Sequence, residues 1–343
     1  MYEFFKYLYH LWIDSPQKWY PLTAFYYLTY ACDFRCPYCS DGSGTPYYKL
    51  SPAILPGQAV ISLLKVIRQK SDSLFITGGE PLSHPDFVYV MENIGDLRFK
   101  KVVLTTNGYR VDLYLDKIAA AVQILSFSLD TLNHDKADAY FGVGKGTLAK
   151  ILANIERATR YQNYQISISS VVTPNNIEDL YDVYHYSQER RFLFAASPQL
   201  IGVKVPKALI NCERYRKFYD FLISERRKGR KIFGSITYLE YMRDLPKFTC
   251  HPFTMLVVSP VGDIFYPCLE IGNFAGNLLK NADLHQIRQE SERQFGPQPQ
   301  CDTRCHSACA LAFSIALHQP FSIPQDIYLT AKGKIRNILN LHH

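Results

Sequence analysis

The stretch Cys32-Asp-Phe-Arg-Cys36-Pro-Tyr-Cys39 decides how the rest of this sequence is interpreted. Its three cysteines are spaced by three and then two residues, and they follow the run Ala24–Tyr30, which predicts a strand. Thiolates are soft ligands that favour zinc, copper(I) and iron–sulfur clusters. A structural zinc site is closed by four protein ligands, whereas three thiolates on a four-iron cluster leave one iron open.

This loop resembles the CxxxCxxC loop of the radical S-adenosylmethionine (radical SAM) enzymes. In that family the loop holds a [4Fe–4S] cluster whose fourth iron binds the amino and carboxylate groups of SAM. Tyr38, before the third cysteine, is aromatic as in that family, and the resemblance makes it a cofactor-binding residue. We therefore expect Cys32, Cys36 and Cys39 to be cluster ligands. The alternative is three buried structural cysteines.

From Ala24 onward, strand-like runs alternate with helical stripes, which is typical of an α/β fold with a parallel sheet. The predicted strands are Ala24–Tyr30, Ser73–Thr77, Lys101–Thr105, Gln123–Leu129, Gln165–Val172 and Arg191–Ala196. Six such units resemble the radical SAM core, a partial (β/α)6 barrel of the TIM type. In such barrels the ligands lie at the C-terminal ends of the strands.

A turn with two glycines, Thr77-Gly78-Gly79-Glu80-Pro81, follows the second predicted strand. Glycine lets the backbone come close to a ligand because it has no side chain. The turn resembles the GGE motif that binds the SAM amino group, so Gly78, Gly79 and Glu80 are predicted cofactor-binding residues. A simple strand-to-helix turn is the alternative.

Polar residues also close the third and fourth predicted strands. Asn107 is either part of an Asn-Gly turn or a polar lining of the SAM pocket. Ser126, Ser128 and Asp130 alternate along the chain and share one face of the fourth strand. The resemblance implies that this strand end contacts the SAM ribose, with Ser128 as the first candidate and Asp130 as the second.

A second set of cysteines lies towards the C-terminus: Cys250, Cys268, Cys301, Cys305 and Cys309. The segment Met255–Cys268 predicts a hairpin that turns at Pro260–Asp263. These features resemble the twitch and SPASM extensions of radical SAM enzymes, which bind auxiliary [4Fe–4S] clusters. A full SPASM extension has seven cysteines and this set has five, so we expect one auxiliary cluster. A zinc site remains an alternative, with His251 and His306 also available.

Composition sets outer limits. A formal net charge of +7 on 343 residues is too small to indicate nucleic-acid binding. The nine cysteines are an odd number in two clusters plus Cys212, which argues against a disulfide framework and for metal use in a reducing compartment.

No signal peptide or long apolar run is evident, so we expect a cytoplasmic protein with no membrane span. The stripe within Tyr2–Ile13 predicts a helix, packed under the main domain or lying at a membrane interface.

We therefore predict three parts: an N-terminal helical segment (1–22), a radical SAM core barrel (23–232) and an auxiliary-cluster domain (233–343). The resemblance implies an oxidoreductase that cleaves SAM reductively and takes its electron from a flavodoxin or ferredoxin. The substrate is either a small biosynthetic intermediate, to be oxidised or epimerised, or a ribosomally made peptide. A non-enzymatic iron–sulfur or zinc scaffold is a third hypothesis, but an open iron would have no use there.

Overall fold

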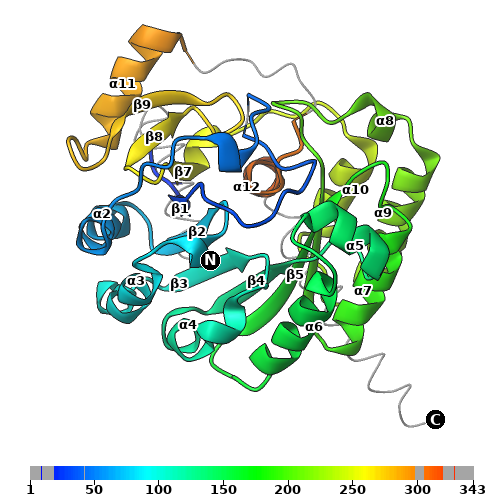
Figure 1. The fold of residues 1–343 in the computed structure, drawn as a ribbon. Coiled ribbons are helices and arrows are strands. Elements are labelled where there is room, and N and C mark those ends of the chain that lie inside the picture. The colour runs from blue at the N-terminus through cyan, green and yellow to red at the C-terminus, as the bar shows by residue number, and fades with distance from the viewer. Residues whose placement is uncertain (1–8, 10–18, 42, 298–304, 320–327, 329–343) are drawn as a thin grey trace. The chain divides into compact units, whose positions relative to one another are not determined.

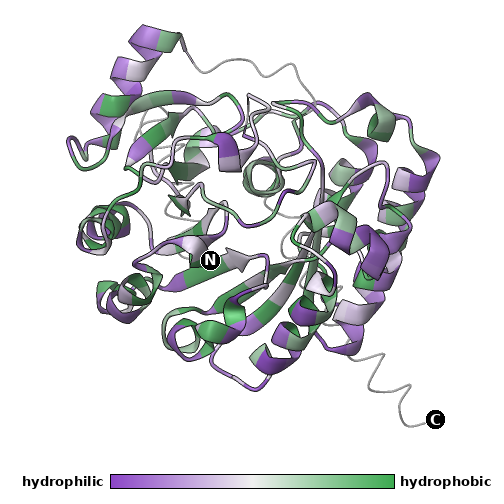
Figure 2. Cartoon of the chain, viewed as in Figure 1, coloured by the Kyte–Doolittle hydropathy of each residue, from purple (hydrophilic) through white to green (hydrophobic). Residues whose placement is uncertain are grey.

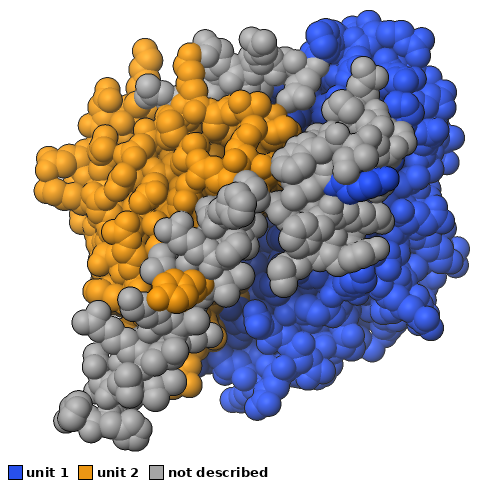
Figure 3. Space-filling model, turned by 180° about the vertical axis from the view of Figure 1, so that it is seen from behind, with its two compact units in different colours: residues 1–128, 134–166, 252–300 blue, residues 129–133, 167–251, 301–343 orange. Residues whose placement is uncertain are grey.

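The computed structural model describes residues 9, 19–41, 43–297, 305–319 and 328 of the chain. The chain divides into two compact units, which Figure 3 shows in different colours. Unit 1 comprises residues 1–128, 134–166 and 252–300, and unit 2 comprises residues 129–133, 167–251 and 301–343.

Parallel strands form the centre of unit 1. Their order in the sheet is β4 (Ile124–Ser128), β3 (Lys101–Thr106), β2 (Ser73–Gly78), β1 (Thr23–Thr29) and β7 (Met255–Val258). Ala24 pairs with Leu74 on one side of β1 and with Leu256 on the other. The antiparallel strands β8 (Asp263–Tyr266) and β9 (Asn273–Asn277) continue the sheet beyond β7. The carboxyl ends of β1 to β4 therefore share one edge.

Amphipathic helices cover the strands of unit 1. Three of them, α2 (Gly57–Lys70), α3 (Phe87–Ile94) and α4 (Leu115–Ala121), follow one another along the outer side of β1 to β4 (Figure 1). The apolar stripe of α2 consists of Val60, Leu63, Leu64 and Ile67, and all four side chains are fully buried. Burial of each stabilises the fold by about 2 kcal/mol. Figure 2 shows the resulting pattern, with hydrophobic strands inside and polar helix faces outside.

The remaining helices of unit 1 connect or follow its strands. They are α5 (His134–Phe141), α6 (Thr147–Ala158) and α11 (Leu284–Phe295). The apolar stripe of α6 is buried at Leu148, Ile151 and Ile155 and half-buried at Leu152.

Unit 2 is built around β6 (Leu193–Pro198) and the greater part of β5 (Gln165–Val172), which pair in parallel from Ser167 and Leu193 onward. Its helices are α7 (Asp179–Glu189), α8 (Lys207–Ile210), α9 (Glu213–Arg227), α10 (Ile236–Asp244) and α12 (Ala308–His318). Tyr215 and Tyr219 of α9 are fully buried, and their rings lie 4.8 Å apart. Aromatic packing therefore forms much of this core.

The predicted α/β class, with parallel strands typical of a partial TIM barrel, is confirmed, and all six predicted strands are present. The predicted hairpin is also present as β7 and β8, but β7 extends the sheet of unit 1 by pairing with β1. The predicted N-terminal helix lies outside the described residues, apart from Tyr9. The boundaries at 22 and 232 stay predictions. Among the described helices, none has the length and apolar character needed to span a membrane.

Candidate metal centre

The loop with Cys32, Cys36 and Cys39 begins directly after β1, at the edge where the parallel strands end. Cys32 and Cys36 are half-buried and Cys39 is exposed. Phe34 N donates a hydrogen bond to Cys32 Sγ (3.4 Å), which favours a thiolate at that position. Burial raises the pKa of the Cys32 thiol to about 12, so a metal centre that binds here must displace its proton.

An aromatic contact anchors the middle of this loop. The Phe34 ring stacks on Phe141, the last residue of α5, with ring centroids 4.7 Å apart. Arg35 N donates to Phe141 O (2.9 Å), and Arg35 Nη1 donates to Cys32 O (2.7 Å). The chain between the first two cysteines is therefore held by packing and by backbone hydrogen bonds.

The turn after β2 lies against the chain that leads into the cysteine loop. Gly79 N donates to Thr29 O and Glu80 N donates to Ala31 O, both at 2.8 Å. A Cβ atom at Gly78 would lie 2.2 Å from Thr29 O, and one at Gly79 would lie 2.3 Å from Ala31 O. The sequence predicted these glycines for close approach to a ligand. In the structure they are required by the close approach of two backbone segments.

Glu80 is buried beside this turn, with 1% of its surface exposed. Its carboxylate accepts three hydrogen bonds, from Leu82 N (3.2 Å), Thr106 Oγ1 (2.8 Å) and Asn107 N (2.7 Å). Burial raises its pKa to about 7, against the effect of these hydrogen bonds. A carboxylate has about four acceptor positions, and Glu80 uses two of them to hold the end of β3 and the loop after it.

Asn107 connects that loop to the cysteine loop. Asn107 Nδ2 donates to Asp33 Oδ1 (2.8 Å), and Arg110 Nε lies 3.1 Å from Asp33 Oδ2. The sequence reasoning missed Asp33 and Arg110. The position of Asp33 between two predicted ligands was the signal available for it, whereas nothing in the pattern around Arg110 indicated a role.

The other predicted cofactor-binding residues lie on separate elements. Tyr38 is half-buried, and its ring centroid lies 6.1 Å from that of Tyr140. Ser128 is half-buried at the last position of β4. Asp130 is a buried residue of unit 2, where its Oδ1 accepts a hydrogen bond from Val171 N (2.7 Å) and burial raises its pKa to about 7. Their roles in cofactor binding stay predictions.

The second cysteine set is distributed over both units. Cys250, Cys305 and Cys309 are half-buried residues of unit 2, and Cys309 is in the first turn of α12. Cys268 is half-buried in unit 1, and Cys301 lies outside the described residues. Within the described part of the chain, no three histidine, cysteine, aspartate or glutamate side chains form a preformed metal site. The ligand assignments at both cysteine sets therefore rest on residue type and position in the chain.

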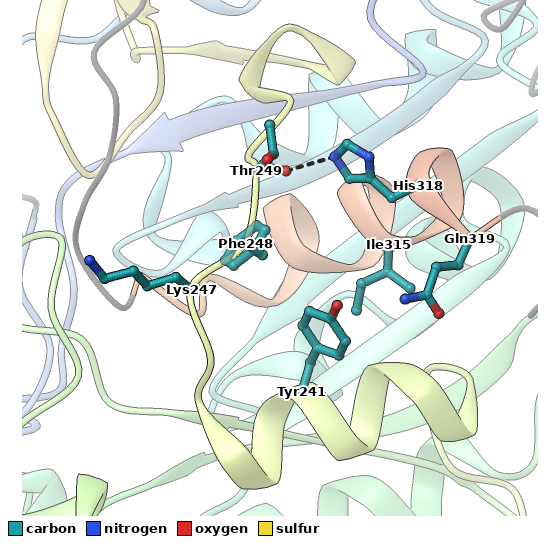
Figure 4. Close-up of a pocket in the computed structure, with 7 residues that line it drawn as sticks. All are labelled: Tyr241, Lys247, Phe248, Thr249, Ile315, His318 and Gln319. Atoms are coloured by element: carbon teal, nitrogen blue, oxygen red, sulfur yellow. Dashed lines mark hydrogen bonds between the residues drawn. The ribbon is translucent and has the colours of Figure 1, made fainter.

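Unit 2 contains a pocket of 250 Å³. It is lined by Tyr241, Lys247, Phe248, Thr249, Ile315, His318 and Gln319 (Figure 4). His318 Nε2 lies 3.2 Å from Thr249 O and 3.1 Å from His251 Nε2. None of the predicted site residues lines this pocket, although Cys250 is adjacent to Thr249 in the chain.

Comparison with known proteins finds similarity over the part of the chain that contains the first cysteine loop. The model of the Radical SAM superfamily matches residues 26–186. GTP 3′,8-cyclase of Synechocystis sp. is 32% identical over 174 residues, which are 48% of this chain and 51% of that protein. Molybdenum cofactor biosynthesis protein 1 of Dictyostelium discoideum is 32% identical over 152 residues, covering 42% of this chain and 23% of that protein. The chain thus spans about half the length, or less, of these curated relatives.

Solved structures share the fold at low sequence identity. Streptococcus suis SuiB bound to precursor peptide SuiA has a TM-score of 0.62 and 16% identity, covering 79% of this chain and 65% of that one. Native anSMEcpe with bound AdoMet has a TM-score of 0.61 and 17% identity, covering 94% of this chain and all of that one.

Proposed function

We propose that the chain, whose residues 26–186 match the model of the Radical SAM superfamily, cleaves SAM reductively and abstracts a hydrogen atom from a small biosynthetic intermediate. The observation that carries the proposal is the position of the three-cysteine loop, directly after β1 at the carboxyl edge of parallel strands. Ligands bind at this edge in barrels of this kind.

The residues of the loop suit a [4Fe–4S] cluster. Three thiols are soft ligands of the right number, and the Phe34 N–H already points at Cys32 Sγ. A cluster bound there would supply the electron for reductive SAM cleavage and hence the radical chemistry of hydrogen abstraction. Cys32, Cys36 and Cys39 would hold the cluster and leave one iron for SAM.

The chain's other contribution is to hold SAM and to exclude competing reactions. We assign SAM contacts to Tyr38, Gly78, Gly79, Glu80, Asn107, Ser128 and Asp130. The burial of Glu80 supports an indirect role for its carboxylate, which keeps the glycine turn and Asn107 in place.

The curated relatives support a small-molecule substrate, because GTP 3′,8-cyclase is named for a reaction of a nucleotide. A ribosomally made peptide is the second candidate, since a structural neighbour binds a precursor peptide. We further propose one auxiliary [4Fe–4S] cluster at the second cysteine set, with zinc as the alternative, and a flavodoxin or ferredoxin as electron donor. The positive net charge favours an acidic donor.

The test is SAM cleavage by the anaerobically reconstituted full-length protein. With dithionite, the wild type should convert SAM to 5′-deoxyadenosine, and the variant with Cys32, Cys36 and Cys39 changed to alanine should not. Cys212→Ala is the matched control, because Cys212 lies outside both cysteine sets, and it should retain cleavage. Cleavage that persists in the triple variant would sink the proposal.

A second measurement separates the two substrate classes. A deuterated substrate should transfer deuterium to 5′-deoxyadenosine, because the radical takes its hydrogen from the substrate. GTP is the first small molecule to test, given the relatives, and candidate precursor peptides form the other arm. Transfer from a peptide alone would replace our proposal with the second candidate.

A further inference from the structure

Asp33 follows the first predicted cluster ligand and joins the cysteine loop to the loop after β3. Its Oδ1 accepts a hydrogen bond from Asn107 Nδ2 (2.8 Å), and its Oδ2 lies 3.1 Å from Arg110 Nε. The Asp33 side chain is only 13% exposed and the Arg110 side chain is 44% exposed, so water screens the ion pair in part. We call Asp33, Asn107 and Arg110 the Asp33 bridge.

The central member of the Asp33 bridge has a fixed orientation. Asn107 Oδ1 accepts a hydrogen bond from Tyr109 N (2.9 Å), so its Nδ2 is the group that faces Asp33. Asn107 N also donates to Glu80 Oε2 (2.7 Å), and Glu80 is buried. The side-chain amide that meets Asp33 is therefore held by Tyr109 N, and the backbone of Asn107 is held by the Glu80 carboxylate.

Both chain neighbours of Cys32 are tied to the same group. On one side, Ala31 O accepts a hydrogen bond from Glu80 N (2.8 Å). On the other side, Asp33 binds Asn107, which is itself bonded to Glu80. These contacts close a ring in which Cys32 lies between two anchored residues.

We propose that Asp33 is a positioning residue for the cluster-binding loop and that its ion pair with Arg110 tunes the reduction potential of the cluster. This inference rests on the proposed function, because it concerns a cluster held by Cys32. A nearby carboxylate disfavours an added electron, whereas a nearby guanidinium favours it. The two members of the ion pair therefore act on the potential with opposite signs.

The test compares reconstituted full-length Asp33→Asn and Arg110→Gln variants with the wild type. Removal of the negative charge should raise the potential, and removal of the positive charge should lower it. The potential is measured on the electron paramagnetic resonance signal that SAM alters, because only a cluster with an open iron responds to SAM. Asp72→Asn is the matched control: Asp72 forms ion pairs with Arg68 and Lys100 just before β2, and its loss should leave the potential unchanged. If the potential shifts with the same sign in Asp33→Asn and Arg110→Gln, or shifts no more than in the control, the proposed tuning of the potential by the ion pair is overturned.

A second set of variants tests positioning. Asp33→Ala loses both contacts and should release iron to a chelator about tenfold faster than the wild type. Asp33→Asn combined with Asn107→Asp reverses donor and acceptor and should restore slow release. Release from Asp33→Ala at the rate of Asp72→Asn, or no rescue by the exchange, would overturn the positioning role. Melting temperatures show whether each variant folds. A wild type that holds iron but does not cleave SAM counts against the proposed function alone, since the iron measurements remain valid.

Discussion

Glu80 combines two properties that oppose each other. Its carboxylate accepts a hydrogen bond from Asn107, and the burial that makes this contact possible disfavours the ionised form of the carboxylate. Its folded-state pKa is about 7 and its ordinary value is 4.5, so unfolding releases protons between these values. The contribution of Glu80 to the free energy of unfolding is complete below pH 4.5 and falls by about 3 kcal/mol as the pH rises through 7.

This direction of the pH dependence gives a prediction for the variant Glu80→Gln, whose side chain cannot ionise. The difference in unfolding free energy between wild type and variant should shift by about 3 kcal/mol against the wild type from pH 4.5 to pH 8. Asp130, whose pKa is raised in the same direction, is present in both proteins and cancels in this difference. Denaturant titrations at several pH values measure it. A difference that stays constant with pH for Glu80→Gln would contradict the buried-charge account.

The sequence identified Glu80 and the cysteines as candidate site residues, but it did not show which groups surround them. A motif shows which side chains follow a strand, and parallel strands bring their ends to one edge, so the predicted positions were accessible from pattern alone. The donors that face Glu80 come from residues 82, 106 and 107, and no local pattern states that these groups meet. From the sequence we expected Glu80 to bind SAM, and its burial now predicts an effect on stability as well.

At the level of secondary-structure elements, the close backbone contact between the end of β2 and the chain after β1 can be tested by substitution. A Cβ atom at Gly79 would meet Ala31 O at 2.3 Å and Tyr30 O at 2.5 Å, and backbone atoms cannot turn aside as a flexible side chain can. We expect Gly79→Ala to lower the unfolding free energy by about 1–3 kcal/mol and to loosen the start of the cysteine loop.

Gly95→Ala is the control for that change. A Cβ atom at Gly95 meets nothing within 4 Å, and its backbone is helical, so the substitution should be neutral or slightly stabilising. Thermal melting compares the two variants, and iron content after reconstitution reports on the loop. Equal stability of Gly79→Ala and the wild type would show that the two segments separate at little cost.

Strand positions were predictable to within about two residues because buried runs and helical stripes are local signals. The pairing of β7 with β1 was not, since more than 200 residues separate their partners Thr23 and Met255. The hairpin pattern indicates that β7 and β8 pair with each other, but it carries no information about a second neighbour on the other side of β7. A non-local contact of this kind appears only in the structure.

Across the whole chain, the compact units are assembled from separate stretches, with residues 252–300 in unit 1 and 167–251 in unit 2. No local pattern in the sequence states this grouping, and the boundary at 232, which follows a change in composition, stays a prediction. The substrate class cannot be predicted from the sequence for the same reason. Side chains from several strand ends determine it, and no motif marks them. The number of metal centres is the property of the whole molecule that residue counts address most directly.

Five cysteines lie beyond Gly234, and one cluster with full cysteine ligation uses four. Two such clusters would need more thiolates than the segment contains, so we expect about eight irons per chain, four in each of two clusters. The variant lacking Cys32, Cys36 and Cys39 should then keep about four. Single alanine variants at Cys250, Cys268, Cys301, Cys305 and Cys309 would show which four ligate, because the one substitution outside the ligand set should leave the iron content unchanged. Near-zero iron in the triple variant, with one zinc per chain, would instead make the second set a structural zinc site and remove its role in electron transfer, because zinc has no redox chemistry.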